Sequence, residues 1–576
     1  MRELETDVLI VGGAGAGLTA AIELSRKGVS YHLIERYPAP SPAPKAHYLN
    51  PRTMEIFRAW GIEKDVASRG TPPEHMARVG WYTSLGGDGE LDRKRIHIMD
   101  AFGGGSLREA YERHSPCWAS NYPQLRLEPL LLEHARSYDG ADLNYGRELQ
   151  SFEQDANGVT AVIAARGGGE AYRVRAKYMI AADGGRTVGP ALGVEMQGAP
   201  RLFDMVTAYF AADLSAYIDD DSPMIRWFNN PERGGSWGSG VMVALGPERY
   251  DRYSREWLFH FAFLPDDPAQ FDETSVVPQL RELLRLPDTE ITILKMNNWQ
   301  VQGVLAERFR VGRVFLVGDA GHRHPPTTGL GLNSAIQDVH NLVWKLARVL
   351  RGEAGDALLD TYESERRPVC ARNVEWALLT FQNHAVFDLA LGLIPNAPVE
   401  VNRNQFRTFF SDTPIGATRR ALMEELGSSQ RVEFQAHDVE IGFYYETGAL
   451  VGDGTAPPPR DPLGTTHHPT TRPGHRMPHA WLERGGERLS THDLIDGSRF
   501  VLITGDARAW VEAAAQAGCE IAVEEVTAPA WVALNEIERD GAVLVRPDGH
   551  VGWRVTACPA DPARALKDAM STILAL

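Results

Sequence analysis

The stretch TDVLIVGGAGAGLTAAIELSRKGVSYHLIER, residues 6–36, indicates how the N-terminal part of the chain folds. A short apolar run leads into a cluster of glycines, a segment with helical periodicity follows, and a second apolar run ends the stretch. This order predicts a strand, a helix and a second strand, which together form a βαβ unit.

The glycines of this stretch lie at the turn between the first strand and the helix. At Gly12, Gly15 and Gly17 the missing side chains allow the backbone to approach a pyrophosphate held at the helix N-terminus. Glu35 closes the second strand, near the spacing at which an acidic side chain bonds a ribose hydroxyl. Ala14 replaces the middle glycine of the usual GxGxxG pattern, and its methyl group narrows the turn. The sequence contains one such motif, which predicts one tightly held dinucleotide.

Composition excludes several other classes of protein. The net charge is -17, with 59 Lys and Arg against 76 Asp and Glu, which disfavours a nucleic-acid partner. No segment approaches the roughly 20 apolar residues of a membrane-spanning helix, so we expect no membrane partner. The cysteines are too dispersed for a zinc pattern or a disulfide ladder, which favours a reducing, cytoplasmic location. They are Cys117, Cys370, Cys519 and Cys558.

The segment GDAGHRHPPTTGLGLN, residues 318–333, lies between an apolar run and a long amphipathic stretch that predicts a helix ending near Gly352. It resembles the second FAD motif of the flavoprotein aromatic hydroxylases, the group that includes para-hydroxybenzoate hydroxylase and phenol hydroxylase. The resemblance implies that Asp319 holds the ribityl chain and that Pro326 and the glycine-rich turn line the flavin ring.

The end of this segment adds a physical expectation. Gly329 and Gly331 form the turn, and the backbone N–H groups of Leu332 and Asn333 lie at the start of the helix. Such groups can stabilise the negative charge that develops on a reduced flavin.

Further matches extend the resemblance. AADGGRT, residues 181–187, is similar to the family's DG motif, which implies that Asp183 and Arg186 lie near the cofactor. Gln124 matches a glutamine found near the flavin, and Lys45 stands where many relatives carry an arginine that contacts the cofactor phosphates. Arg36, which follows Glu35, completes the set of expected cofactor-binding residues.

Two longer stretches, residues 44–62 and 115–135, are similar to the phenol hydroxylase and 2,4-dichlorophenol 6-monooxygenase branch of the family. His47 stands where phenol hydroxylase carries an aspartate beside the substrate hydroxyl. An imidazole there could orient or deprotonate a phenol, so His47 is the expected catalytic residue. The alternative is a buried histidine that is hydrogen-bonded to the backbone.

The resemblance implies an FAD-dependent monooxygenase that takes electrons from NADPH or NADH and hydroxylates a phenolic substrate with O2 through a flavin C4a-hydroperoxide. Two alternatives remain open at this point. One is a hydroxylase or Baeyer-Villiger-type oxygenase of a polycyclic aromatic polyketide. The other is a flavin-binding redox or regulatory protein without oxygenase turnover. A small aromatic substrate is the expected partner, and a homodimer is left open.

The implied fold class is α/β, or α+β overall. A glutathione-reductase-type FAD-binding domain carries an inserted antiparallel substrate sheet, and a C-terminal thioredoxin-like domain follows. This last domain contains no CxxC, so thiol redox activity is not expected. The expected boundaries are 1–190 and 301–400 for the FAD-binding domain, 191–300 for the substrate sheet, 401–450 for a helical region, 451–480 for a Pro/Gly-rich linker and 481–576 for the C-terminal domain.

For several other side chains we predict a structural role and no functional one. His322 and His324 could be read as a metal pair, but no carboxylate or cysteine accompanies them at ligand spacing, so no metal is expected. The histidines of the linker are expected in a solvated loop, and most aromatic residues of the middle sheet are expected in the core. The first set is His467, His468, His475 and His479, and the second includes Trp227, Trp237, Trp257, Phe259 and Phe261.

Overall fold

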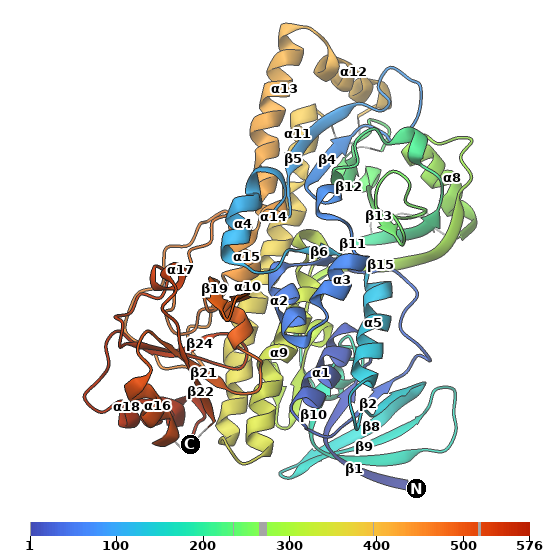
Figure 1. Ribbon diagram of the computed structural model, residues 1–576. Helices are drawn as coiled ribbons and strands as arrows, with labels where there is room; N and C mark the ends of the chain where they lie inside the picture. Colours follow the sequence, from blue (N-terminus) through green and yellow to red (C-terminus); the bar gives the residue numbers. More distant parts are fainter. Residues whose placement is uncertain (1, 234, 264–272, 395–396, 517–519) are drawn as a thin grey trace.

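The structure is a computed structural model that describes residues 2–233, 235–263, 273–394, 397–516 and 520–576, so Cys519 lies outside the described residues. One end of the molecule holds the N-terminal sheet, a second sheet lies above it, and the C-terminal unit packs against one side (Figure 1). The long helices α9 (Leu330–Leu350) and α10 (Thr361–Asn383) run through the centre. Within the described ranges, no helix has the length and apolar character needed to cross a membrane.

The N-terminal sheet forms from the apolar runs that flank the first glycines. β1 pairs in parallel with β2 through the helix α1 (Gly15–Arg26), and on its other side with β10. The strand order is β16-β17-β10-β1-β2-β7, while β8, β9 and β10 pair antiparallel and confirm the hairpins expected after residue 146. Its strands are β1 (Arg2–Val11), β2 (Tyr31–Glu35), β7 (Leu143–Tyr145), β8 (Arg147–Asp155), β9 (Gly158–Ala165), β10 (Tyr172–Ala181), β16 (Arg310–Val311) and β17 (Val314–Leu316).

The second sheet has the order β18-β15-β11-β14-β13-β12-β4-β5. β4 and β5 come from a part of the chain that we expected to lie entirely in the FAD-binding domain, because their pairing partner β12 is distant in sequence and no local pattern predicts it. The strands are β4 (Arg78–Tyr82), β5 (Arg95–Asp100), β11 (Met196–Ala211), β12 (Pro223–Phe228), β13 (Val241–Gly246), β14 (Glu256–Phe263), β15 (Thr292–Ala306) and β18 (His322–Arg323).

The two faces of this second sheet have different partners. Because side chains alternate along a strand, Trp257, Phe259 and Phe261 point to one face, where they pack with apolar residues of α8 (Glu273–Leu284). Leu258 and His260 point to the other face, where Leu258 belongs to a cluster that packs against Leu125 of the FAD-binding domain. The core expectation for the three aromatic residues is confirmed.

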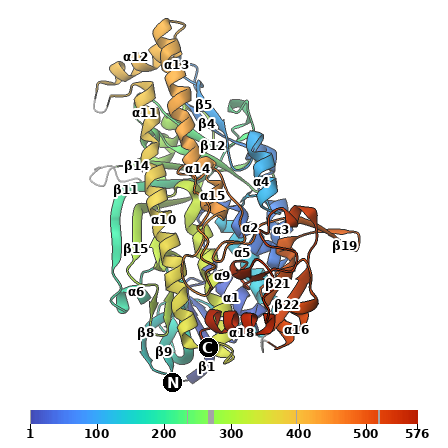
Figure 2. The same ribbon diagram turned by 90° about the vertical axis from the view of Figure 1, so that its left-hand side faces the viewer.

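The remaining helices surround these sheets or extend from them. A group of helices after α10 projects beyond the second sheet (Figure 2). Gly352, at φ 72, closes α9 by donating its N–H to Val349 O, as its position in the sequence predicted. Outside the C-terminal unit, the other α-helices of at least five residues among the described residues are α2 (Pro51–Trp60), α3 (Glu63–Arg69), α4 (Arg108–His114), α5 (Gln124–Arg136), α11 (Ala385–Leu391), α12 (Val399–Phe410), α13 (Pro414–Gly427) and α15 (His437–Ile441).

The C-terminal unit has the strand order β22-β21-β23-β24, with β21 and β22 parallel and the other pairs antiparallel. This topology, with α16 and α18 packed on the sheet, is thioredoxin-like as expected. The elements are β21 (Phe500–Thr504), α16 (Arg508–Gln516), β22 (Ile521–Glu525), β23 (Ala542–Val545), β24 (Val551–Val555) and α18 (Pro562–Ile573).

Buried ion pairs fasten this unit to the rest of the molecule. Arg546 donates to both carboxylate oxygens of Glu365 on α10 at 2.8 Å, and Arg476 pairs with Glu55 on α2. These four side chains are nearly inaccessible. The Pro/Gly-rich segment expected at residues 451–480 is therefore not a free linker where it passes Arg476. The solvated loop expected for the linker histidines is wrong for His475 and His479, which are buried. His467 is partly buried, and His468 is exposed as expected.

Candidate cofactor and active site

The first glycine turn is built for close backbone approach. A Cβ added at Gly17 would lie 1.8 Å from Gly12 O, and one at Gly12 would lie 2.2 Å from Ala182 O. A Cβ at Gly15 would meet the end of the Leu332 side chain at 2.6 Å. The turn therefore touches both the loop after β10 and the start of α9, which brings three motifs of the sequence together.

The helix that follows this turn begins without a side-chain cap. Ala14 is its N-cap residue and makes no capping hydrogen bond, and the Gly15 N–H already donates to Glu128. Among the described residues this leaves the next N–H groups of the helix, at Ala16 and Gly17, available to an anion. Glu35 lies beside the turn, where its carboxylate accepts hydrogen bonds from Gly13 N at 2.7 Å and Tyr37 N at 2.8 Å. Arg36 extends past Glu35, with its guanidinium 5.2 Å from the centre of the Tyr37 ring.

Gln124 begins α5 on the opposite side of the same turn. Its side-chain N–H donates to Glu128 Oε1 at 2.6 Å, and Gly15 N donates to that same oxygen at 3.2 Å. Burial raises the pKa of Glu128, while Gln124 and the nearby Lys45 offset part of this effect. Glu128 was not among the predicted site residues, although its place one helical turn after Gln124 could have indicated that the two side chains meet.

The second motif follows β17 (Val314–Leu316) and leads into α9. The Asp319 carboxylate is exposed and has no hydrogen-bonding partner in the part of the chain that the structure describes, so it is available to a polyol. Pro326 is also exposed, and Gly329 adopts the left-handed conformation at φ 65 as the N-cap of α9. This N-cap forms no side-chain hydrogen bond, so the first N–H groups of α9 remain available near Gly331.

Asn333 ties the second motif to the segment that carries His47. Its side-chain N–H donates to Tyr48 O at 2.9 Å and to Gly329 O at 2.6 Å, and its Oδ1 accepts from Asn50 N at 3.0 Å. From the sequence we predicted a role only for the backbone N–H of Asn333. Its buried side chain also holds the turn at Gly329 against residues 48–50.

The DG motif has a clear structural role. Asp183 Oδ1 accepts from Gly185 N at 3.1 Å, and Oδ2 accepts from Thr187 N at 2.7 Å and Val188 N at 2.9 Å. These bonds hold the loop that contacts Gly12 on one side and Asp319 O on the other. Arg186 is exposed at the tip of this loop.

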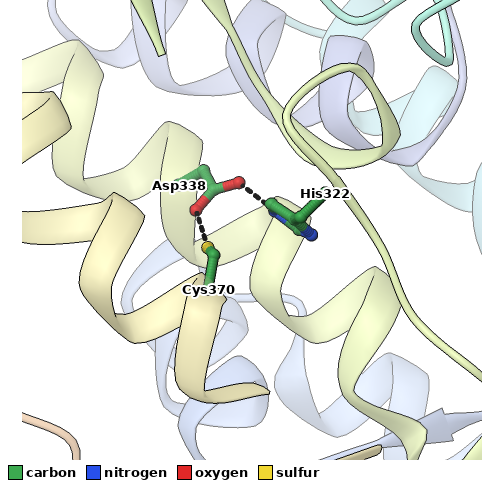
Figure 3. A group of neighbouring side chains, drawn as sticks. All are labelled: His322, Asp338 and Cys370. Atoms are coloured by element: carbon green, nitrogen blue, oxygen red, sulfur yellow. Dashed lines mark hydrogen bonds and ion pairs between the residues drawn. The ribbon is translucent and has the colours of Figure 1, made fainter. Parts of the chain in front are cut away.

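His322, Asp338 and Cys370 form a buried cluster behind the second motif (Figure 3), and their ligand atoms lie within 4.8 Å of one another. His322 Nε2 lies 2.7 Å from Asp338 Oδ2, and Arg366 Nε donates to Asp338 Oδ1 at 2.9 Å. Burial alone would lower the pKa of His322, but Cys370 and Asp338 raise it well above its usual value.

The contacts of this cluster form an ion network. The Asp338 carboxylate is shared between the His322 ring on one oxygen and the Arg366 guanidinium on the other. Asp338 Oδ2 also accepts from Gly318 N at 3.1 Å, so the network anchors the turn that carries Asp319. The premise that no carboxylate or cysteine accompanies His322 is wrong, because the fold brings Asp338 and Cys370 beside it from distant parts of the chain, and the absence of a metal stays a prediction.

Asp338→Asn is expected to lower the free energy of unfolding by about 3–5 kcal/mol, because it leaves a buried guanidinium without its counter-charge. Chemical denaturation followed by fluorescence and flavin release measures this change. Glu109→Gln, which removes an exposed partner of Arg113, is the control and is expected to leave stability unchanged. Equal effects of the two substitutions would contradict the anchoring role.

His47 lies immediately before β3 (Tyr48–Leu49), which pairs with β6 (Ser120–Asn121). Its Nδ1 lies 2.8 Å from Asn121 Oδ1, and the Asn121 side-chain N–H donates to Thr71 Oγ1 at 2.7 Å. The alternative of a histidine bonded to the backbone is therefore wrong for this ring, since its partner is a side chain. The His47 ring is partly accessible, and burial lowers its pKa.

The arrangement fits FAD. Around β1, α1 and α9 lie a glycine turn too tight for side chains, the Glu35 carboxylate, and an Asp319 carboxylate that has no partner among the described residues. Two helix N-termini whose N-cap residues form no side-chain hydrogen bond lie there as well. A dinucleotide of this kind needs such groups for its pyrophosphate, ribose and polyol chain. The fold and the site together define a flavoprotein of the glutathione-reductase type.

Comparison with known proteins identifies the group. Residues 5–377 match the FAD binding domain family, and residues 470–575 match the family described as aromatic-ring hydroxylase, C-terminal. The chain belongs to the FAD-dependent aromatic hydroxylase family. It is therefore an oxidoreductase of the monooxygenase class, which sets aside the alternative of a regulatory flavoprotein without turnover.

Three relatives illustrate the match. Phenol 2-monooxygenase of Pseudomonas sp. (strain EST1001) is 34% identical over 590 residues, which cover 99% of this chain and 93% of the relative. Tetracenomycin A2 monooxygenase-dioxygenase of Streptomyces glaucescens is also 34% identical, over 100% of this chain and 98% of the relative. The crystal structure of the flavin-dependent monooxygenase PieE in complex with FAD and substrate is 38% identical, with a TM-score of 0.93 and full coverage of both chains.

Proposed function

We propose that this enzyme hydroxylates a phenolic ring and that His47 holds or removes the phenolic proton. The observation that carries the proposal is the hydrogen bond between His47 Nδ1 and Asn121 Oδ1, from which we infer the tautomer of His47. Asn121 Oδ1 is an acceptor, because the other end of that amide donates to Thr71, so His47 Nδ1 carries the hydrogen. His47 Nε2 is then left with a lone pair directed away from Asn121.

The ionisation of His47 supports the same role. Burial lowers its pKa, and the hydrogen bond to Asn121 offsets part of that shift. The ring is therefore neutral near pH 7 and can accept a proton from a phenol. Loss of that proton pushes electron density onto the ortho and para carbons of the substrate, where an electrophilic oxygen attacks.

Bound FAD supplies the redox chemistry, with NADPH or NADH as electron donor and O2 as oxidant. The residues of the chain contribute binding and electrostatics. Gly12, Gly15 and Gly17, with Glu35, would hold the pyrophosphate and ribose, while Asp319 would hold the ribityl chain. The backbone N–H groups of Leu332 and Asn333 would stabilise negative charge on the flavin ring. The apolar inner face of the second sheet excludes water from the reacting atoms.

The test is substrate-stimulated NAD(P)H oxidation by the purified flavoprotein, with the product identified by mass spectrometry. A hydroxylated phenol that contains one oxygen atom from labelled O2 is the expected result. NAD(P)H consumption that no phenol stimulates would contradict the proposal.

A polycyclic aromatic polyketide is the second candidate substrate. The supporting observation is that the tetracenomycin A2 relative is as similar to this chain as phenol 2-monooxygenase is, over nearly the full length of both chains. The same assay separates the two candidates when simple phenols and polycyclic quinones are compared as substrates. Turnover with the polycyclic compounds alone would favour the second candidate.

A further inference from the structure

His260 is a polar residue on an otherwise apolar strand face. It pairs with Thr207 across β14 and β11, and its neighbour on the same face, Leu258, belongs to a buried apolar cluster. The two residues that flank it, Phe259 and Phe261, point to the opposite face and pack toward α8. His260 is thus directed toward the FAD-binding domain, the side on which His47 lies.

The hydrogen bonds of Thr207 fix the tautomer of His260. Trp299 Nε1 can only donate, and it donates to Thr207 Oγ1 at 2.9 Å. The other partner of that hydroxyl within the described residues is His260 Nδ1, at 2.7 Å. The Thr207 hydroxyl hydrogen therefore goes to Nδ1, and the imidazole hydrogen of a neutral His260 lies on Nε2.

The Nε2–H group of His260 is left without a protein partner in the described ranges. The side chain is nevertheless partly accessible, as His47 is. Burial and the charge of nearby His47 lower the pKa of His260 to about 3, so the ring stays neutral. The two histidines are close enough to influence each other, and neither adds a charge to this part of the molecule at neutral pH.

The two rings present opposite hydrogen-bonding groups. His47 Nε2 carries a lone pair and accepts a hydrogen bond, whereas His260 Nε2 carries a hydrogen and donates one. A phenol hydroxyl that donates to His47 satisfies His260 as well only when its one oxygen lies within hydrogen-bond distance of both Nε2 atoms, and a buried donor without a partner is unfavourable. A substrate that carries a separate acceptor group satisfies both rings without that constraint.

We propose that His260 is a specificity-determining residue, which donates a hydrogen bond from Nε2 to an acceptor on the substrate, a carbonyl, ether oxygen or ring nitrogen distinct from the phenolic hydroxyl. The preferred substrate is then an uncharged aromatic compound that carries both groups, and a phenol with no second group is a poorer substrate. This inference rests on the function proposed above and names the class of phenol involved.

The experiment compares two probes that differ only in the acceptor. A hydroxytetralone carries a phenolic hydroxyl and, on the fused ring, a carbonyl, while the matching tetrahydronaphthol lacks the carbonyl. The quantity measured is the ratio of their kcat/KM values in the wild type and in each variant. Differences in intrinsic acidity between the probes cancel when the ratios are compared.

His260→Phe is expected to lower this ratio about tenfold, mainly through KM for the hydroxytetralone, which is the loss of one hydrogen bond. His260→Gln, whose amide keeps a donor near the Nε2 position, should retain most of the preference. His97→Phe is the control, because His97 lies in the same sheet and burial also lowers its pKa, but it packs against Trp81 and Phe387. That variant should leave the ratio unchanged.

Each outcome distinguishes the two proposals. An unchanged ratio in His260→Phe, including the case in which kcat/KM falls equally for both probes, would overturn the role of His260 while the phenol hydroxylase function stands. A wild-type enzyme that hydroxylates neither probe and shows no change of flavin absorbance with either would contradict the proposed function, and this inference would fall with it.

Discussion

His47→Ala is expected to slow hydroxylation of the phenolic substrate at least 100-fold while FAD remains bound, because a positioned general base typically contributes a factor of this size. The Asn121 amide would lose its partner, but the glycine turn and the start of α9 do not depend on His47. Single-turnover hydroxylation, flavin absorbance and hydrogen peroxide release together measure the effect. Oxygen consumption should continue and appear as peroxide, since the electrons no longer reach the substrate.

The pH dependence gives an independent check of this role. A base must be neutral to act, so the hydroxylation rate should fall as the pH drops through the pKa of His47. Burial lowers that pKa, which moves this limb below the ordinary value of 6.5. In His47→Ala the limb should disappear. Coupled turnover that is unchanged in rate and in pH profile would contradict the assignment.

Gly17→Ala is expected to abolish stable FAD binding. The added Cβ would lie 1.8 Å from the carbonyl oxygen of Gly12, and a backbone atom cannot rotate away as a side chain can. The turn must open, at a typical overpacking cost of about 1–3 kcal/mol, and the backbone then no longer follows the pyrophosphate. The ratio of flavin to protein absorbance after purification measures the loss.

Two matched substitutions separate this effect from a general effect of alanine. Gly15→Ala meets only the flexible end of Leu332 at 2.6 Å, so a smaller loss of FAD is expected. Gly452→Ala has no atom within 4 Å of the added Cβ and should bind FAD as the wild type does. Full FAD occupancy in Gly17→Ala would show that the turn does not need this close contact.

The parts of the site that could be predicted are those built from neighbouring residues. The glycine turn, Glu35 and the helix start after Gly329 each belong to a short segment whose residue types already restrict the backbone, so a resemblance in sequence carries the geometry with it. The alternation of side chains along the strands could also be predicted from the sequence. The alternation did not indicate which face of the sheet packs on α8 and which faces the FAD-binding domain, because that depends on tertiary packing.

The nucleotide-binding turn and the cofactor class follow from short segments of sequence, because those features depend on local backbone geometry. The folded chain alone shows the ion pairs of Asp338 with His322 and Arg366, the burial of His475 and His479, and the hydrogen-bonding partners of His47 and His260. These last partners, Asn121 and Thr207, are distant in the chain, and no local pattern of residues specifies them.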